Sequence, residues 1–392
     1  MRKSERMRTV IVECKLPSLP SRVDEAKAMA ENVGYEVVDS VVQRRKSIHH
    51  SFCIGPGKLD ELNRLCREKK IDLAIFTNTL PSSQIFKIQK ELGGNIKVID
   101  RNMLILEVFD KRAMTKEAKL QIKLAKLKYT FSWGREFIKL QGILGEQVGW
   151  SGPGDYPFKE YEREAKKRIS RLEEALEEVY EKKAILRQRR RELGYPIVAL
   201  AGYTQSGKTT FFNRLVSESK SVGLGPFTTL STYARRMSLA DESSNINFIL
   251  VDSIGFIEDM HPIILKAFNA TLSEITNADL ILLFVDLSDD PGVLNRRVAS
   301  TSKILREMDV NSEMIVCANK VDLVDSECAK RANEIIGRHM LGVDIVQVSA
   351  RTGENLDQVL DLMRRKMKQS GIQRNSAQNV TSDLDEADRQ PN

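Results

Sequence analysis

A glycine-rich loop at residues 202–209 constrains what this chain can fold into more than any other segment does. The loop reads Gly-Tyr-Thr-Gln-Ser-Gly-Lys-Thr, and it lies between an apolar run at residues 196–201 and a helix-like segment at residues 210–215. A strand, such a loop and a helix form a phosphate-binding unit, because the glycines let backbone N–H groups point inward at a triphosphate. At ordinary glycine usage the fixed positions would occur by chance in roughly one chain in a hundred. A plain glycine-rich turn is therefore the weaker interpretation, and we expect a bound nucleotide.

A second motif indicates which base this nucleotide carries. Residues 319–322 read Asn-Lys-Val-Asp and follow a strand-like run at residues 314–318. The Asp322 carboxylate can accept hydrogen bonds from guanine N1–H and from its exocyclic amine, and adenine lacks this pair of donors. The wrong base would leave buried polar groups unpaired, which costs on the order of several kcal/mol. The expected ligand is therefore GTP and not ATP.

Two further motifs complete the pattern. Residues 252–255 read Asp-Ser-Ile-Gly after an apolar run, so Asp252 can hold the Mg²⁺ shell while the Gly255 amide approaches the γ-phosphate. Residues 349–351 read Ser-Ala-Arg after another strand-like run, where a tight turn can present an N–H group to guanine O6. Asp-x-x-Gly alone is common, but four motifs in the order found in GTPases make a coincidence negligible.

The sensor of Mg²⁺ and the γ-phosphate is expected between the phosphate loop and Asp252. Residues 226–231 are expected to form a loop, because two glycines lie just before the segment and a proline is its first residue. The segment contains two threonines, Thr228 and Thr229. We select Thr229 rather than Thr228. The alternative is that both are ordinary solvated loop threonines.

The predicted site residues fall into three groups. Those expected to act in hydrolysis are Lys208, Thr229 and Gly255. Those expected to hold Mg²⁺ are Thr209, Thr229 and, through water, Asp252. Those expected to contact GTP are Gly202, Tyr203, Thr204, Gln205, Ser206, Gly207, Lys208, Thr209, Phe227, Thr228, Thr229, Leu230, Ser231, Asp252, Ser253, Ile254, Gly255, Asn319, Lys320, Val321, Asp322, Ser349, Ala350 and Arg351.

These motifs resemble those of the translation-factor-related GTPases, and of the HflX family in particular. Residues 252–257 are similar to that family's Asp-Thr-Val-Gly-Phe-Ile, and residues 227–230 are similar to its Phe-Ala-Thr-Leu. Landmarks of the family's N-terminal half also resemble residues 55–58, 98–101, 112–121 and 152–154. The resemblance covers nearly the whole chain. It implies a GTPase that associates with the large ribosomal subunit and its rRNA through the N-terminal region.

The chain also departs from the family pattern. Many relatives carry in the phosphate loop an Asn associated with monovalent-cation binding, and this chain has Gln205, so potassium activation does not carry over. Ser231 replaces an acidic residue, and residues 154–158 differ from the family's Gly-Pro-Gly-Glu loop. Phe256 stands where small GTPases have a water-orienting Gln. The chain stops soon after its last GTPase helix, as in short, archaeal-like members that lack an extra C-terminal domain.

The hydrophobic pattern predicts an α/β protein in several parts. We expect a small α/β domain at residues 1–108, a helical hairpin at 109–193, a GTPase domain at 194–370 with a mostly parallel sheet covered by helices on both faces, and a disordered tail at 371–392. In the first part, expected strands at residues 8–13, 35–42, 72–76 and 96–99 alternate with expected helices at residues 21–31, 59–68 and 81–92. We interpret residues 55–58 as a structural turn, because they are too short for a phosphate loop.

The helical hairpin is the candidate contact for RNA. Helices are expected at residues 112–129 and, with apolar residues at heptad spacing, at residues 160–192. A glycine-rich tip that carries Trp150 is expected between Leu140 and Pro157. The net charge of +7 and a pI of about 9.0 favour a polyanionic partner. The alternative is a solvated coiled-coil face, because glutamates share the second helix.

The composition is typical of a cytoplasmic protein, and we expect a monomer with Mg²⁺ as cofactor. No apolar run approaches the length of a membrane span, and five scattered cysteines favour reduced thiols. The leading hypothesis is a GTP-hydrolysing switch that acts in ribosome biogenesis, splitting or protein synthesis. A second is an RNA-binding assembly factor that uses GTP only to sense state. A third, an RNA-remodelling ATPase in the N-terminal domain, has only residues 55–58 in its favour.

Overall fold

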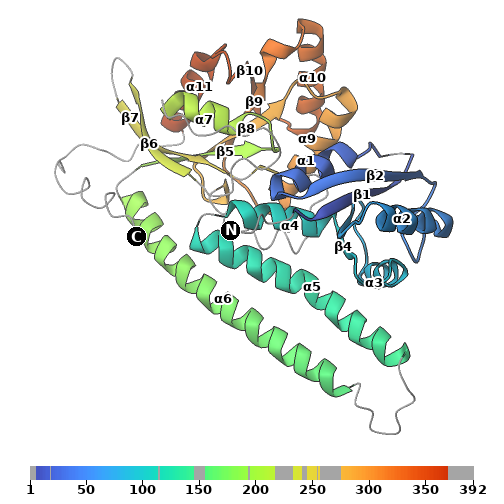
Figure 1. Cartoon of the computed structure of the whole chain (residues 1–392). Helices are drawn as coiled ribbons and strands as arrows, with labels where there is room; N and C mark the ends of the chain where they lie inside the picture. Colours follow the sequence, from blue (N-terminus) through green and yellow to red (C-terminus); the bar gives the residue numbers. More distant parts are fainter. Residues whose placement is uncertain are drawn as a thin grey trace.

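The computed structural model describes residues 6–17, 19–113, 115–144, 155–192, 195–216, 233–240, 245–253, 255–256 and 275–369. Figure 1 shows a small sheet with its helices, a long helical hairpin, and a larger sheet with its own helices. The expected α/β class, with a small α/β part and a hairpin before the GTPase fold, is confirmed. Among the described residues, none of the helices combines the length and the apolar character needed to cross a bilayer.

The small sheet is parallel, as the alternating pattern predicted. Its strands are β1 (Arg8–Lys15), β2 (Glu36–Arg44), β3 (Leu73–Phe76) and β4 (Lys97–Asp100), in the order β2-β1-β3-β4. Alternate residues of β1 enter different cores, Val10 and Val12 on one face and Ile11 on the other. Both faces are therefore buried, and α1 (Val23–Val33), α2 (Pro56–Glu68) and α3 (Ser82–Glu91) supply the cover.

Two helix assignments in this part needed correction. Helix α4 (Arg101–Arg112) was not predicted, because most of its residues are buried and a helix buried nearly all round shows no 3.6-residue stripe. Asp100 caps this helix by accepting a hydrogen bond from the Met103 N–H at 3.0 Å. Helix α2 begins at Pro56, with Gly55 at its N-cap, so residues 55–58 are mainly the first turn of a helix.

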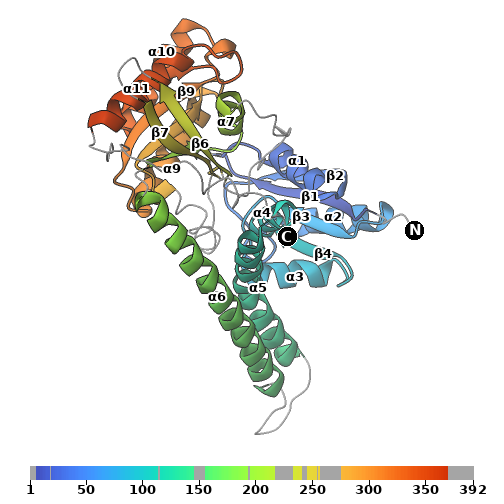
Figure 2. The same ribbon diagram turned by 90° about the vertical axis from the view of Figure 1, so that its left-hand side faces the viewer.

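The hairpin consists of α5 (Lys116–Leu144) and α6 (Asp155–Glu192), which run side by side away from both sheets (Figure 2). Both helices extend further toward the tip than expected. Gly142 lies in α5, and residues 155–157 lie in α6. The prediction that the tip extends from Leu140 to Pro157 was therefore wrong at both ends, because the two helices include the outer residues of that range. Residues 145–154, with Trp150, lie outside the described residues, as does the tail at 371–392.

The larger sheet has the strand order β10-β9-β8-β5-β7-β6. All its described neighbours are parallel except β6, which runs antiparallel to β7. The central strand β8 is buried at every position, as its continuous apolar run predicted. The strands are β5 (Ile197–Gly202), β6 (Tyr233–Ala240), β7 (Asn245–Asp252), β8 (Leu280–Asp286), β9 (Glu313–Asn319) and β10 (Asp344–Val348).

Helices cover both faces of this sheet. Residues of α9 (Pro291–Glu307) and α10 (Ser326–His339) share a core with one face, and residues of α7 (Lys208–Val216) and α11 (Leu356–Gln369) share a core with the other. A parallel sheet covered on both sides leaves one accessible edge for chemistry, at the carboxyl ends of its strands. The four sequence motifs follow β5, β7, β9 and β10 and therefore converge on that edge.

Candidate nucleotide site

The phosphate loop joins β5 to α7 and depends on two glycines. Gly202 has φ of 132°, and a Cβ there would lie 2.2 Å from the Phe284 carbonyl oxygen. Gly207 has φ of 97°, and a Cβ there would lie 2.1 Å from the Asn319 side-chain amide. Any side chain at these positions would combine left-handed strain with a collision. The glycines are thus required by the packing of β8 and β9 as well as by the phosphates that the loop could surround.

Lys208 is buried inside this loop. Its ammonium donates hydrogen bonds to the carbonyls of Gly202 at 3.0 Å and Tyr203 at 2.6 Å. Burial lowers the pKa of Lys208 to about 8, and the negative charge of Asp252 opposes that shift. The ammonium therefore lies next to the concave backbone where phosphates would bind, with few charges nearby to compensate it.

Thr209 and Asp252 form the candidate metal position. The Thr209 hydroxyl donates a hydrogen bond to the Asp252 carboxylate at 3.0 Å, which brings two oxygen ligands together from α7 and β7. Mg²⁺ prefers oxygen ligands and is usually held by one or two protein groups plus phosphates and water. This donor set fits Mg²⁺. Several other predicted contacts lie outside the described residues, namely Phe227, Thr228, Thr229, Leu230, Ser231 and Ile254.

The segment after Asp252 pairs with the phosphate loop. The Phe256 N–H donates to the Gly202 carbonyl at 2.9 Å, and its own carbonyl accepts from the Thr204 N–H at 3.1 Å. A Cβ at Gly255 would lie 2.7 Å from the Thr204 nitrogen and 2.9 Å from the Lys208 ammonium. Gly255, Thr204 and Lys208 therefore meet at one point. Phe256 is buried and has no polar side-chain atom to orient water.

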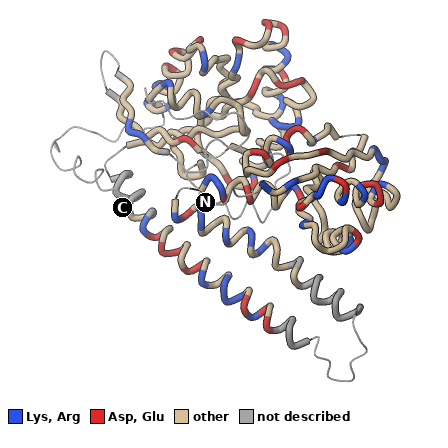
Figure 3. The backbone as a smooth tube through the Cα atoms, in the orientation of Figure 1, with Lys and Arg blue, Asp and Glu red and all other residues tan. Residues whose placement is uncertain are grey.

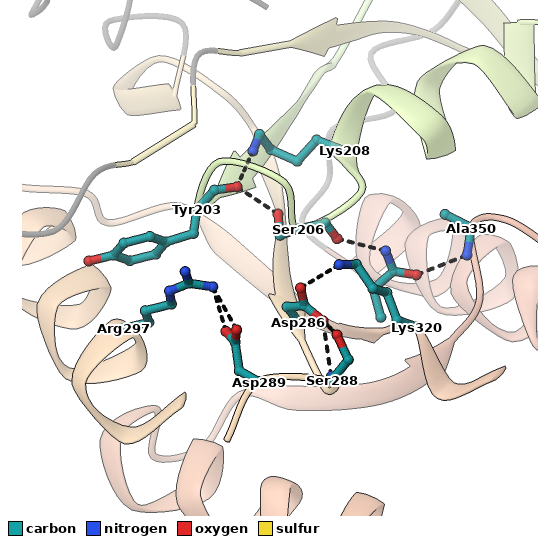
Figure 4. A network of polar contacts seen from close by, with 10 residues as sticks. Tyr203, Ser206, Lys208, Asp286, Ser288, Asp289, Arg297, Lys320 and Ala350 are labelled. Carbon is teal, nitrogen blue, oxygen red and sulfur yellow. Dashed lines mark hydrogen bonds and ion pairs between the residues drawn. The ribbon is translucent and has the colours of Figure 1, made fainter. Parts of the chain in front are cut away.

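Asn319 connects the phosphate loop to the loop expected to meet the base (Figure 4). Its side-chain amide donates to the Ser206 carbonyl at 2.7 Å, and its side-chain oxygen accepts from the Ala350 N–H at 2.9 Å. All three residues are buried. One side chain thus fixes the distance between two motifs that lie far apart in sequence.

The neighbouring residues of this motif are held in a strained turn. Lys320 adopts a left-handed conformation with φ of 68°, and its ammonium pairs with Asp286 at 2.5 Å. Asp286 also accepts hydrogen bonds from the N–H and hydroxyl of Ser288. Asp322 follows in a short 3-10 helix (Val321–Leu323) and is exposed, so its carboxylate is accessible to a base.

Arg214 anchors the last motif to the phosphate-loop helix. From α7 its guanidinium donates to the carbonyls of Arg351 at 2.8 Å and Thr352 at 2.6 Å. Ser349 supports the same turn, because its hydroxyl accepts from the Thr352 N–H at 3.0 Å. The turn that would present a backbone N–H to a base is therefore fixed from two sides.

The sequence did not reveal every residue of this network. Asp286 and Arg214 were missed, although Asp286 directly follows the apolar run of β8, where a polar residue at a strand's carboxyl end is a useful signal. Ser253 was predicted to contact GTP, and in the structure its hydroxyl donates a hydrogen bond to the Leu200 carbonyl at 2.5 Å. Within the described ranges, no group of three or more His, Cys, Asp or Glu residues is arranged to hold a metal ion.

Three protein-family models match the chain. The model described as GTP-binding GTPase N-terminal matches residues 20–110, and the one described as GTP-binding GTPase Middle Region matches residues 112–190. The model described as 50S ribosome-binding GTPase matches residues 197–320.

Curated relatives and a solved structure extend this likeness. A GTPase HflX of Thermococcus kodakarensis is 36% identical over 347 residues, which span 87% of this chain and 76% of that protein. A GTPase HflX of Thermofilum pendens is 36% identical over 348 residues, 88% of this chain and 80% of that protein. The crystal structure of a protein called SsGBP in complex with GDP has a TM-score of 0.51 and 26% identity, over 93% of this chain and 99% of that one.

Proposed function

The chain belongs to the HflX family of GTPases, and we propose that it uses GTP hydrolysis as a switch on the large ribosomal subunit. The observation that carries this proposal is the position of Asn319, which bonds the phosphate loop on one side and the base loop on the other. A site fixed in this way binds a base and its phosphates as one rigid unit. The matching family description, 50S ribosome-binding GTPase, supports the ribosome as partner, and a cytoplasmic location follows from that partner.

Guanine selection is assigned to the residues after β9 and β10. Asp322 would accept hydrogen bonds from N1–H and the exocyclic amine. Because the Ala350 N–H already bonds Asn319, a neighbouring backbone N–H of the same turn would donate to O6. The exposed carboxylate and the fixed turn at Ala350 support these roles. The paired Asp286 and Lys320 keep the intervening turn in place.

Mg²⁺ would be held by the Thr209 hydroxyl, by Asp252 through water, and by Thr229. When bound, the ion neutralises charge on the β- and γ-phosphate oxygens. The 3.0 Å contact between Thr209 and Asp252 supports this assignment for the first two residues. The assignment of Thr229 as a Mg²⁺ ligand is based on its position in the sequence alone.

Hydrolysis would then depend on charge compensation more than on a side chain that orients water. Lys208 would hold the terminal phosphates, and the Gly255 amide would approach the γ-phosphate. Phe256 leaves the attacking water without a side-chain acceptor, so intrinsic turnover should be slow. A partner that orders the segments around the γ-phosphate would accelerate it.

The hairpin is the proposed probe for rRNA. Basic residues are frequent along α5, while acidic and basic residues alternate along α6 (Figure 3). Some of this charge is already paired, because Lys126 contacts Asp110 and Lys128 contacts Glu173. The glycine-rich tip with Trp150 therefore carries the RNA proposal better than the helix faces do, since an aromatic ring can stack on an unpaired base.

The test compares GTP turnover with and without purified large ribosomal subunits. The parent chain should be stimulated, and a variant in which residues 141–155 are replaced by a short Gly-Ser linker should bind GTP normally but respond less. Raised salt should weaken subunit binding steeply, because phosphate contacts dominate it. Negligible GTP turnover even with large subunits would favour the second hypothesis, an RNA-binding assembly factor that uses GTP only to sense state. Full stimulation of the linker variant would make the tip a passive connector.

A further inference from the structure

A cleft lies between the small N-terminal part and the phosphate loop, and Tyr203, Thr204 and Gln205 line its phosphate-loop side. Its volume is about 380 Å³. One wall comes from the loop after β1, from α1 and from the start of α4, and it includes Arg22, Glu25 and Arg101. The other wall comes from the phosphate loop and α9, and it includes Thr204, Arg296 and Arg297. Residues of α1 and of α9 thus face the same cleft from opposite walls.

The cleft carries an excess of positive charge. Four arginines line it, against two carboxylates. Two of the arginines are fixed by acidic partners: Arg101 pairs with Glu25 at 2.8 Å, and Arg297 makes two hydrogen bonds to Asp289, at 2.6 and 2.8 Å. Arg22 and Arg296, which also have interaction partners, are half-buried and come from opposite walls. Such a cleft favours an anion.

The nearest anion that the known activity supplies is the terminal phosphate of GTP. Thr204 lines the cleft and also meets Gly255 and Lys208 at the point proposed for the γ-phosphate. Gln205, the next residue, is exposed and adopts φ of 66°, so it projects from the same rim of the loop. The cleft therefore adjoins the γ-phosphate side of the phosphate loop.

A further positive charge beside the γ-phosphate would accelerate GTP hydrolysis in this chain. Phe256 cannot assist the attacking water, and Lys208 is the one cation buried within the phosphate loop among the described residues. In related phosphoryl-transfer enzymes an arginine that contacts the transferring phosphoryl group raises the rate by about 10³ to 10⁵. An arginine from the N-terminal part could act in the same way within one chain.

Arg22 is the arginine whose backbone is placed for this task. The buried carboxylate of Glu13, at the end of β1, accepts hydrogen bonds from the Arg22 N–H and the Ser21 hydroxyl, both at 2.7 Å. The Thr77 hydroxyl, after β3, donates to the same carboxylate at 3.3 Å. The loop that carries Arg22 is thus fixed to the sheet, while the side chain lines the cleft.

We propose that Arg22 is a catalytic residue that the N-terminal part supplies to the GTPase site in the same chain, where its guanidinium contacts the γ-phosphate during hydrolysis. Water attacks the γ-phosphorus, the bond to the β–γ bridging oxygen breaks, and GDP and inorganic phosphate leave. Arg22 neutralises charge that develops on the phosphate oxygens and exchanges no proton. The inference rests on the proposed γ-phosphate position, and nucleotide affinity tests that position separately.

The test uses the full-length chain with Arg22→Ala, Arg22→Lys and the control Lys27→Ala. Lys27 is an exposed cation on α1, the helix that follows Arg22, and it lies outside the described lining of the cleft. We expect single-turnover GTP hydrolysis to fall at least about 100-fold in Arg22→Ala, to be partly retained in Arg22→Lys, and to be unchanged in the control. GTP and GDP affinities should stay within about threefold of the parent, whereas binding of GDP with aluminium fluoride, which mimics the transferring group, should be lost in Arg22→Ala.

Four outcomes would overturn the proposal. In the first, Arg22→Ala hydrolyses GTP as fast as the parent. In the second, Arg296→Ala shows the loss and Arg22→Ala does not, which would place the needed charge within the GTPase part. In the third, Arg22→Ala loses GTP and GDP affinity together with activity, so that the residue only supports the nucleotide site. In the fourth, intrinsic hydrolysis is normal and only large-subunit binding falls, which would assign the charge of the cleft to RNA phosphates. If the parent itself bound no GTP, the proposed function would fail instead.

Discussion

Asn319→Ala removes the link between the phosphate loop and the base loop, and its effect can be worked out from the structure. The change removes two hydrogen bonds: the one that the Asn319 side chain donates to the Ser206 carbonyl at 2.7 Å, and the one that it accepts from the Ala350 N–H at 2.9 Å. Ser206, Asn319 and Ala350 are only 1–2% exposed, so water cannot easily replace the lost partners. Each unsatisfied buried group costs about 1–3 kcal/mol. We therefore expect the GTPase part to lose about 2–4 kcal/mol of stability.

The assay is denaturant unfolding followed by circular dichroism, with and without GDP. Asn319→Asp is the informative second variant, because it keeps the acceptor for Ala350 but turns a carboxylate toward the Ser206 carbonyl. It should be at least as destabilised as the alanine variant although its size is unchanged. Asn311→Ala is the control, since Asn311 is exposed and, among the described residues, its side chain donates hydrogen bonds to the nearby Asp309. It should stay within about 0.5 kcal/mol of the parent.

GDP affinity should fall as well in both Asn319 variants, because the Ala350 turn is no longer held at a fixed distance from the phosphate loop. At about 1.4 kcal/mol per tenfold change, a loss of about fivefold or more is expected if half of the destabilisation appears in binding. If Asn319→Asp unfolds at the same denaturant concentration as the parent and binds GDP equally well, the side chain does not couple the two motifs. The phosphate loop and the base loop would then not form one rigid site.

Two further predictions concern the base and the metal. Asp322→Asn should weaken GTP binding by about 10²-fold or more and admit xanthine nucleotides, since an amide cannot accept from both guanine donors; equal GTP affinity in a titration would show that Asp322 does not select the base. Thr229→Ala should reduce hydrolysis and erase the difference between the GTP-bound and GDP-bound states while GDP still binds, and Thr228→Ala should do much less. Equal effects of the two changes on hydrolysis rates would show that the wrong threonine was selected.

Much of the fold could be predicted because its signals are local. The continuous apolar run at residues 280–285 predicted a fully buried parallel strand, and β8 is the central strand of the larger sheet. Alternating strand and helix patterns predicted the parallel N-terminal sheet. Helix α4 escaped prediction because its surroundings, and not its own pattern, keep most of it buried.

By itself, the sequence determined the nucleotide chemistry expected of this protein. A phosphate loop is contiguous, so its glycines, Lys208 and Thr209 can be recognised before any tertiary contact is known. The other motifs were readable because each directly follows a strand, and the carboxyl ends of parallel strands lie at one edge of the sheet.

Only the tertiary structure decided which distant residues support that chemistry. Arg214 and the Arg351 carbonyl that it holds are 137 residues apart in sequence, and Arg22 lines a cleft with Thr204 because α1 packs near the phosphate loop. No local sequence pattern identifies such pairs, since an arginine with a role at the site cannot be distinguished in the sequence from any other arginine. Their roles come from tertiary packing, because α7 lies against the turn after β10 and the N-terminal part forms one wall of a cleft beside the phosphate loop.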